Sequence, residues 1–221
     1  MRAFYRGTQF WLAAIVAAML PLLVAAQVSF VAVERPYDSY QLLDDIPRQQ
    51  TLYGDLQGFP ELFQFTVTAT TTIPITLRAI DADEHGPLFS LILVRDESQR
   101  GVREISRLAA RETTWDTYRD SRTRMLYLAA PTLAPTLVPG TYRLEVSTPD
   151  NEGRYQLVFG DDPPRLGYVA TWRTIRAIHD FHGYGPPHML RTSHALLPLL
   201  TLLIIVGIFG TWRYARRQRW V

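Results

Sequence analysis

Four of the five histidines lie close together near the C-terminal end of the chain: His179, His182, His188 and His194. A neutral imidazole is a common ligand for zinc and copper. His179 and His182 are three residues apart, so they share one face if this stretch is helical. The spacing matches no dense ligand motif such as H-E-x-x-H. The stretch therefore yields a metal hypothesis, with His179 and His182 as ligands, beside the alternative of ordinary histidines near a membrane interface.

Other reactive motifs are weaker or missing. The segment Asp81–Gly86 begins like a calcium loop, D-x-D-x-x-G, but the twelfth position of an EF-hand falls on Ile92 instead of an acidic residue. That excludes an EF-hand and leaves a calcium-bridged turn or a solvated acidic hairpin tip. The sequence contains no G-x-S-x-G motif, no Gly-rich phosphate loop and no cysteine. These observations predict a non-enzymatic protein without a cofactor.

Charge is distributed unevenly along the 221 residues. All 21 acidic residues lie between Glu34 and Asp180, and six of the 23 basic residues, all of them arginine, lie in the two tails. The middle of the chain is therefore net negative. A nucleic-acid-binding domain concentrates positive charge on its folded part, so no nucleic-acid partner is expected.

Two long apolar segments bound the middle of the chain. Residues 1–26 have a basic start, an apolar run and small residues before Gln27, which is typical of a signal peptide, although the run is also long enough for an uncleaved membrane anchor. Residues 195–212 carry no charge and predict a transmembrane helix. Arginines just beyond a span stay cytoplasmic, and tryptophan favours the interface. The predicted interface residues of this span and of the basic cytoplasmic tail, 213–221, are Trp212, Arg213, Arg216 and Arg217.

Between these segments the dominant sequence period is two. Phe63, Phe65 and Val67 alternate with polar residues, and the same pattern recurs in 73–79, 142–146 and 155–159. One apolar and one polar face is typical of antiparallel strands with one buried side. Gly- and Pro-containing turns separate the runs. Residues 34–162 therefore predict a mainly β domain, an antiparallel β-sandwich of jelly-roll or immunoglobulin-like kind. The stretch 100–120 fits either a short helix or strands, and 88–94 predicts a central strand.

The last two predicted strands carry a family resemblance. The run Pro139–Val146, followed by Asn151, Gly153, Tyr155, Leu157 and Gly160, resembles the closing hairpin of bacterial prepeptidase-C-terminal-type sandwich domains. It is also similar to uncharacterised bacterial single-pass membrane proteins in which such a hairpin leads into a membrane helix. The resemblance implies an accessory or binding β-domain and transfers no catalytic residue. The lack of cysteine and the exclusive use of arginine are compatible with a bacterial envelope.

Residues 165–182 predict an amphipathic helix next to the membrane. At 100° per residue, Trp172, Ile175 and Ile178 share one side and Arg173 and Arg176 the other. The apolar side could lie in the outer membrane interface, with Trp172 and Ile175 in contact with lipid, or it could pack on the sandwich.

These elements predict a single-pass protein of the cell membrane with its β-domain outside and its C-terminus in the cytoplasm. The expected partners are the lipid bilayer and, for an accessory subunit, another membrane protein. A binding module at the envelope surface is the companion hypothesis. A metal-handling protein and a carbohydrate-binding module, with Trp115 and Tyr118 as candidate aromatic contacts, are the alternatives.

Overall fold

The computed structural model describes residues 31–32, 39–44, 46, 48–80, 89–97, 101–161 and 166–217, apart from the side chains of 31, 32, 168, 193, 194, 196–201, 214, 215 and 217. The predicted N-terminal segment 1–26, the Asp81–Gly86 turn and the end of the basic tail lie outside these residues. The described chain forms two compact units. One is a β-domain, and the other is a helical unit that also includes the turn Ser121–Arg124.

The β-domain contains one six-stranded, one five-stranded and one two-stranded sheet among the described residues. The six-stranded sheet has the order β1 (Val31–Ala32), β3 (Gln50–Gln57), β13 (Glu152–Phe159), β6 (Ile75–Ile80), β10 (Leu126–Ala129), β9 (Asp116–Arg119). The five-stranded sheet has the order β2 (Gln41–Leu42), β4 (Glu61–Val67), β12 (Gly140–Ser147), β7 (Ser90–Glu97), β8 (Gly101–Leu108), and β5 (Thr71–Thr72) pairs with β11 (Thr136–Leu137). Pairing is antiparallel except for β1 with β3 and β2 with β4. The prediction of a mainly β chain is confirmed, and the sheets are consistent with a β-sandwich.

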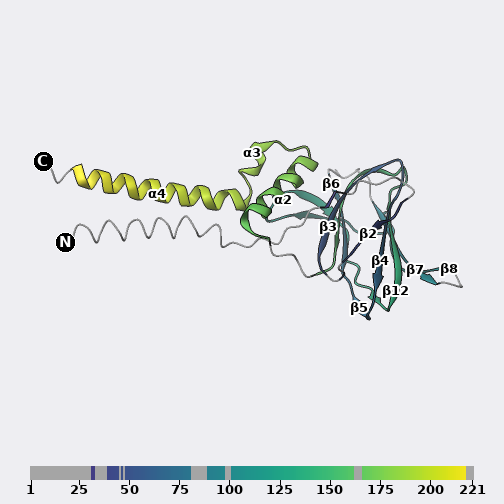
Figure 1. Ribbon diagram of the computed structural model, residues 1–221. Helices are drawn as coiled ribbons and strands as arrows, with labels where there is room; N and C mark the ends of the chain where they lie inside the picture. Colours follow the sequence, from purple (N-terminus) through teal and green to yellow (C-terminus); the bar gives the residue numbers. More distant parts are fainter. Residues whose placement is uncertain are drawn as a thin grey trace. The chain divides into compact units, whose positions relative to one another are not determined.

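Alternating apolar residues of the two large sheets fill one shared core. Leu52 and Leu157 come from the six-stranded sheet, and Phe63 and Leu144 come from the five-stranded sheet; all four are fully buried. In Figure 1, β3 and β6 lie on one side of this domain and β4, β7 and β12 on the other. Aromatic rings join the layers, since Phe65 of β4 meets a ring of β13 edge-on with the centroids 4.9 Å apart.

The predicted closing hairpin is not a hairpin. β12 pairs with β4 and β7, whereas β13 pairs with β3 and β6, so the two strands lie in different sheets. The connection turns through Asn151 and Gly153, which both have positive φ (53° and 117°). The alternation predicted both strands correctly, but a period of two does not identify the partner of a strand.

Two other predictions about strands can be compared with the structure. The ambiguous stretch 100–120 forms strands β8 and β9 with a turn between them, so the strand alternative is confirmed over a helix. The apolar run 88–94 contributes to β7, which lies between β12 and β8 and is therefore an internal strand.

The helical unit contains α2 (Tyr168–Phe181), α3 (Pro186–Met189) and α4 (Ser193–Arg217). The predicted helices at 165–182 and 195–212 correspond to α2 and α4. α2 ends in a Schellman motif: Gly183 N–H donates to the Asp180 carbonyl (3.0 Å), and Tyr184 N–H donates to the His179 carbonyl (2.9 Å). Gly183 has φ +73°, the left-handed conformation that this motif requires.

Replacement of Gly183 with alanine is expected to destabilise this helix end by about 1 kcal/mol, because an alanine Cβ disfavours positive φ. Open space surrounds the position, so steric overlap adds nothing. Hydrogen exchange at the Tyr184 amide should become about fivefold faster. Gly185→Ala is the matched control: its φ is −74° and its added Cβ makes only an ordinary contact with Pro187. Equal exchange rates in both variants would contradict the prediction.

Within the described helices, no segment combines the length and the mean hydropathy needed to cross a bilayer. The helix predicted at 195–212 is present as part of α4, and its predicted membrane crossing remains a prediction.

Candidate functional site

The predicted metal-binding histidines lie at the end of α2, where the Schellman turn folds the chain back. His179 is 1% exposed and His182 is 6% exposed. The Tyr184 ring stacks on His182 (centroids 6.1 Å apart) and meets His179 edge-on (6.5 Å). His188 of α3 lies against the same tyrosine ring at 4.7 Å. The turn thus gathers three of the four histidines around one aromatic ring.

The contacts that the structure gives these rings are aromatic packing. Among the described residues, no group of three or more His, Asp or Glu side chains could hold a metal ion. Structural zinc sites use four ligands and catalytic sites three with water. Burial lowers the pKa of His179, partly offset by the Thr123 backbone. Neither ring nitrogen of His179 makes a hydrogen bond of ordinary geometry within the described chain. Binding of a metal by His179 and His182 stays a prediction, which metal analysis of the purified chain and of a double alanine variant would test.

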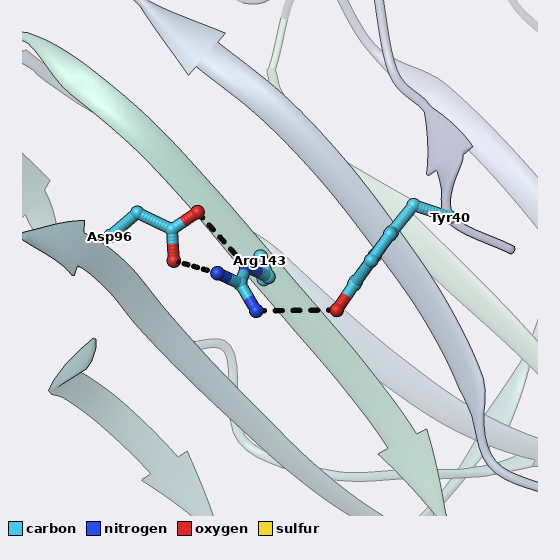
Figure 2. Close-up of polar contacts among 3 residues, drawn as sticks. All are labelled: Tyr40, Asp96 and Arg143. Carbon is cyan, nitrogen blue, oxygen red and sulfur yellow. Dashed lines mark hydrogen bonds and ion pairs between the residues drawn. The ribbon is translucent and has the colours of Figure 1, made fainter. Parts of the chain in front are cut away.

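A second polar constellation lies on the outer face of the five-stranded sheet. Arg143 of β12 donates from Nε to Asp96 of β7 (2.9 Å), and its Nη2 lies 2.5 Å from the other carboxylate oxygen. Nη1 donates to the hydroxyl of Tyr40, 3.2 Å away. Figure 2 shows the guanidinium held between these two side chains. The hydrogen bonds to Asp96 and Tyr40 raise the pKa of Arg143, so its positive charge is permanent.

Arg143 lies on the outer face because apolar and polar residues alternate along β12. Tyr142, Leu144 and Val146 point into the core, which leaves Arg143 and Glu145 on the outer face. The register places Arg143 between Gln64 of β4 and Val94 of β7. At the edge of the sheet, Arg107 of β8 donates to Glu104 (2.8 Å). The outer face therefore presents ordered charges of both signs beside partly exposed aliphatic side chains.

Arg143 also fixes the segment before β2 to the sheet, because its cation lies 5.5 Å from the Tyr40 ring centroid in addition to the hydrogen bond. Arg143→Ala is expected to speed hydrogen exchange at the Leu43 amide, which bonds Gln64 O at 2.8 Å, by about fivefold. Arg143→Lys should recover only part of this protection, since lysine lacks the planar fork. Arg107→Ala, at the exposed edge pair, is the control and should leave Leu43 unchanged.

The predicted membrane-interface residues have different surroundings. Ile175 of α2 is 1% exposed and is therefore covered by protein, whereas Trp172 is half-buried. Trp212 and Arg213 of α4 are exposed, and the Arg216 guanidinium lies 4.3 Å from the Trp212 ring centroid. The side chain of Arg217 lies outside the described part. Contact of these residues with lipid stays a prediction.

The aromatic residues proposed for carbohydrate binding do not form an exposed platform. Trp115 packs against the core and donates to the Ala110 carbonyl (3.2 Å). Tyr118 is 37% exposed, and the Arg78 guanidinium covers its ring at 4.1 Å. The Trp115 N–H and the Tyr118 ring therefore both have partners within the protein.

Some solved structures have a weak similarity to the chain. The pre-peptidase C-terminal domain of a collagenase from Bacillus anthracis shares 18% identity, with 57% of this chain and 99% of that chain covered and a TM-score of 0.35. The Yersinia pseudotuberculosis-derived mitogen shares 16% identity over 54% of this chain and 92% of that chain, with a TM-score of 0.36. PliG of Aeromonas hydrophila, a periplasmic inhibitor of g-type lysozyme, shares 12% identity over 61% and 96%, with a TM-score of 0.28. Similarities at this level carry no argument about function.

No family model matches the sequence, and no curated protein matches it either.

Sequence patterns missed the Asp96–Arg143–Tyr40 constellation, because its members are 47 and 103 residues apart. They also missed Glu61, whose carboxyl group is hydrogen-bonded to Tyr155. One signal was available for Glu61: Gly54 interrupts an otherwise large-residue strand, which marks a close approach by another group.

Proposed function

We propose that this chain is a single-pass, membrane-anchored protein that holds a non-enzymatic β-domain outside the membrane as a binding module or accessory subunit. The proposal of a membrane anchor rests on the exposed apolar surface of α4. Leu202, Leu203, Ile204, Val206, Ile208 and Phe209 are between 43% and 66% exposed. Five consecutive positions cover every side of a helix, and a helix that is apolar on all sides belongs in an apolar environment.

The orientation follows from the charges after residue 212, at the C-terminal end of α4 and beyond it. Residues 195–212 carry no charge, and four arginines follow within the last nine residues. Positive charges that flank a span stay in the cytoplasm. The β-domain, which precedes the span, is then on the outer side.

The location of the side chains with shifted pKa values favours a binding role over catalysis. Among the described residues, burial is the main cause of the shifted pKa values of Tyr53, Glu61, Tyr155 and His179. The first three side chains lie within the β-domain and bond to one another or to neighbouring strands, as in Tyr155 with Glu61. Catalytic groups instead converge on a shared reactive position.

The outer face of the five-stranded sheet is the surface that we assign to binding. It offers the fixed charge of Arg143 with partly exposed Ile92 and Val94 beside it. Arginine is enriched at protein–protein interfaces, where a preordered side chain loses little entropy on binding.

The experiment is purification of the full-length chain from its native membrane in mild detergent, with mass spectrometry of copurifying proteins. Stoichiometric recovery of one membrane protein, lost in an Arg143→Glu variant but retained in Arg107→Glu, supports the accessory-subunit role. Recovery of the chain alone argues against an obligate subunit. Release of the wild-type chain from membranes by alkaline carbonate would contradict the anchor itself.

A further inference from the structure

The β-domain contains a half-buried acid on the core-facing side of a strand. Glu61 is the first residue of β4 and shares the inward side with Phe63 and Phe65, which are fully buried. Its carboxylate accepts a hydrogen bond from the hydroxyl of Tyr155 on β13, in the opposite sheet. Tyr155 is 0% exposed, so this bond joins the two layers inside the domain.

A glycine makes room for this pair. A Cβ placed on Gly54 of β3 would lie 2.4 Å from Glu61 Oε2 and 2.4 Å from the Tyr155 ring. Gly54 is directly opposite Tyr155 in the ladder of the six-stranded sheet. β3, β4 and β13, from two sheets, therefore meet at the carboxyl group of Glu61. A side chain at position 54 would displace this carboxyl group.

The described groups that act on Glu61 are Tyr155 of β13 and Asp55 of β3, and neither is a cation. Asp55 donates its backbone N–H and adds a repelling negative charge. On β12, the residue opposite Glu61 is Val146, which is apolar. Among the described residues, a carboxylate here has two hydrogen-bond donors but no counterion, so its negative charge is only partly compensated.

We propose that Glu61, Tyr155 and Gly54 form a proton-dependent latch between the two sheets, which stabilises the folded β-domain most when Glu61 is neutral and less when Glu61 is charged. In the protonated state a neutral acid lies between the layers and still bonds to the tyrosine. In the ionised state the same site holds a partly desolvated negative charge. The latch makes the β-domain more stable in mildly acidic surroundings than in alkaline ones.

The sign and size of the effect follow from the titration of Glu61. Burial raises the pKa of Glu61 from 4.5 to about 7, against the smaller lowering by Tyr155. A carboxyl whose pKa is raised by folding contributes stability that is complete below the unfolded value and is lost as the pH rises through about 7. Between pH 5.5 and 8.5 the unfolding equilibrium constant should rise roughly 10- to 30-fold.

The test is urea unfolding of the full-length chain in non-ionic detergent between pH 5.5 and 8.5. Fluorescence of Trp115, which packs against the core, gives the signal after the other four tryptophans are replaced by phenylalanine. The wild type should show the 10- to 30-fold change, and Glu61→Gln should remove most of it while unfolding less readily than the wild type at pH 8.5. Glu152→Gln, at an exposed position of β13, should keep the wild-type profile. A Glu61→Gln profile equal to the wild type would overturn the latch.

Tyr155→Phe keeps the test decisive if Glu61→Gln does not fold. This variant keeps the ring and removes the donor that lowers the pKa of Glu61. The pH midpoint of the stability change should therefore move upward. An unchanged midpoint would show that the tyrosine is not part of the latch and would equally overturn it.

Discussion

Replacement of Gly54 with alanine is expected to lower the free energy of unfolding of the β-domain by about 3 kcal/mol. The added Cβ would lie 2.4 Å from the Tyr155 ring, a distance that requires something to move. The ring has no free space to move into, because Tyr155 is fully buried and packs on Phe89 with the centroids 5.5 Å apart. Urea unfolding at pH 6, read from Trp115 fluorescence, measures the loss.

Gly167→Ala is the control for the glycine substitution itself. Gly167 has an ordinary backbone conformation, with φ −67°, and an added Cβ would meet nothing within 4 Å. Its effect on stability should stay within about 0.5 kcal/mol. An equally small effect of Gly54→Ala on the free energy of unfolding would contradict the prediction. It would mean that the two sheets can move apart at this point without an energetic cost.

Two arginines in the middle of α4, Leu203→Arg with Val206→Arg, are expected to prevent its insertion into the membrane. Each arginine near the centre of a span costs about 2.5–3.5 kcal/mol on insertion scales. In wild-type cells, a tag after Val221 should be protected from protease added outside. In the arginine variant the tag should be digested, because the C-terminal tail would follow the β-domain across the membrane. This measurement is independent of whether residues 1–26 are removed.

The apolar double variant Leu203→Ile with Val206→Leu is the matched control and should keep the tag protected. Protection of the tag in the arginine variant as well would mean that α4 does not cross the bilayer. Its exposed apolar side chains would then have to be covered by another protein.

Much of the fold could be predicted from the sequence because the information is local. Alternation of apolar and polar side chains identified the strands that supply Phe63, Leu144 and Leu157, and the absence of charge identified the helix at 195–212. Much of the pairing was not predictable, since partners such as Leu52 and Leu157 are far apart in the chain. The proposed β12–β13 hairpin failed for that reason: two adjacent strands with the same period can pair with each other or with different neighbours.

The candidate sites were less predictable than the fold. Spacing alone suggested that His179 and His182 share a helix face, and they do lie together at the end of α2. Spacing could not show that Tyr184 would fold back onto both rings, because that contact depends on the left-handed Gly183. Ile175 was expected on a lipid-facing side for its apolarity, yet apolarity alone does not distinguish contact with lipid from burial in protein.

The crossing between β12 and β13 also determines when the domain can form during synthesis. β3 and β4 are synthesised early, but Leu52 of β3 pairs with Leu157 and Phe63 of β4 pairs with Leu144. The five-stranded sheet cannot be completed before β12, which ends at Ser147, and the six-stranded sheet cannot be completed before β13, which ends at Phe159. β3 therefore waits for β13 while about a hundred residues are added. Only a short stretch separates the end of β13 from the apolar α4. A ribosome that pauses after β13 would give this slowly closing domain time to fold, and slowing or speeding translation there should alter the yield of folded protein without changing its sequence.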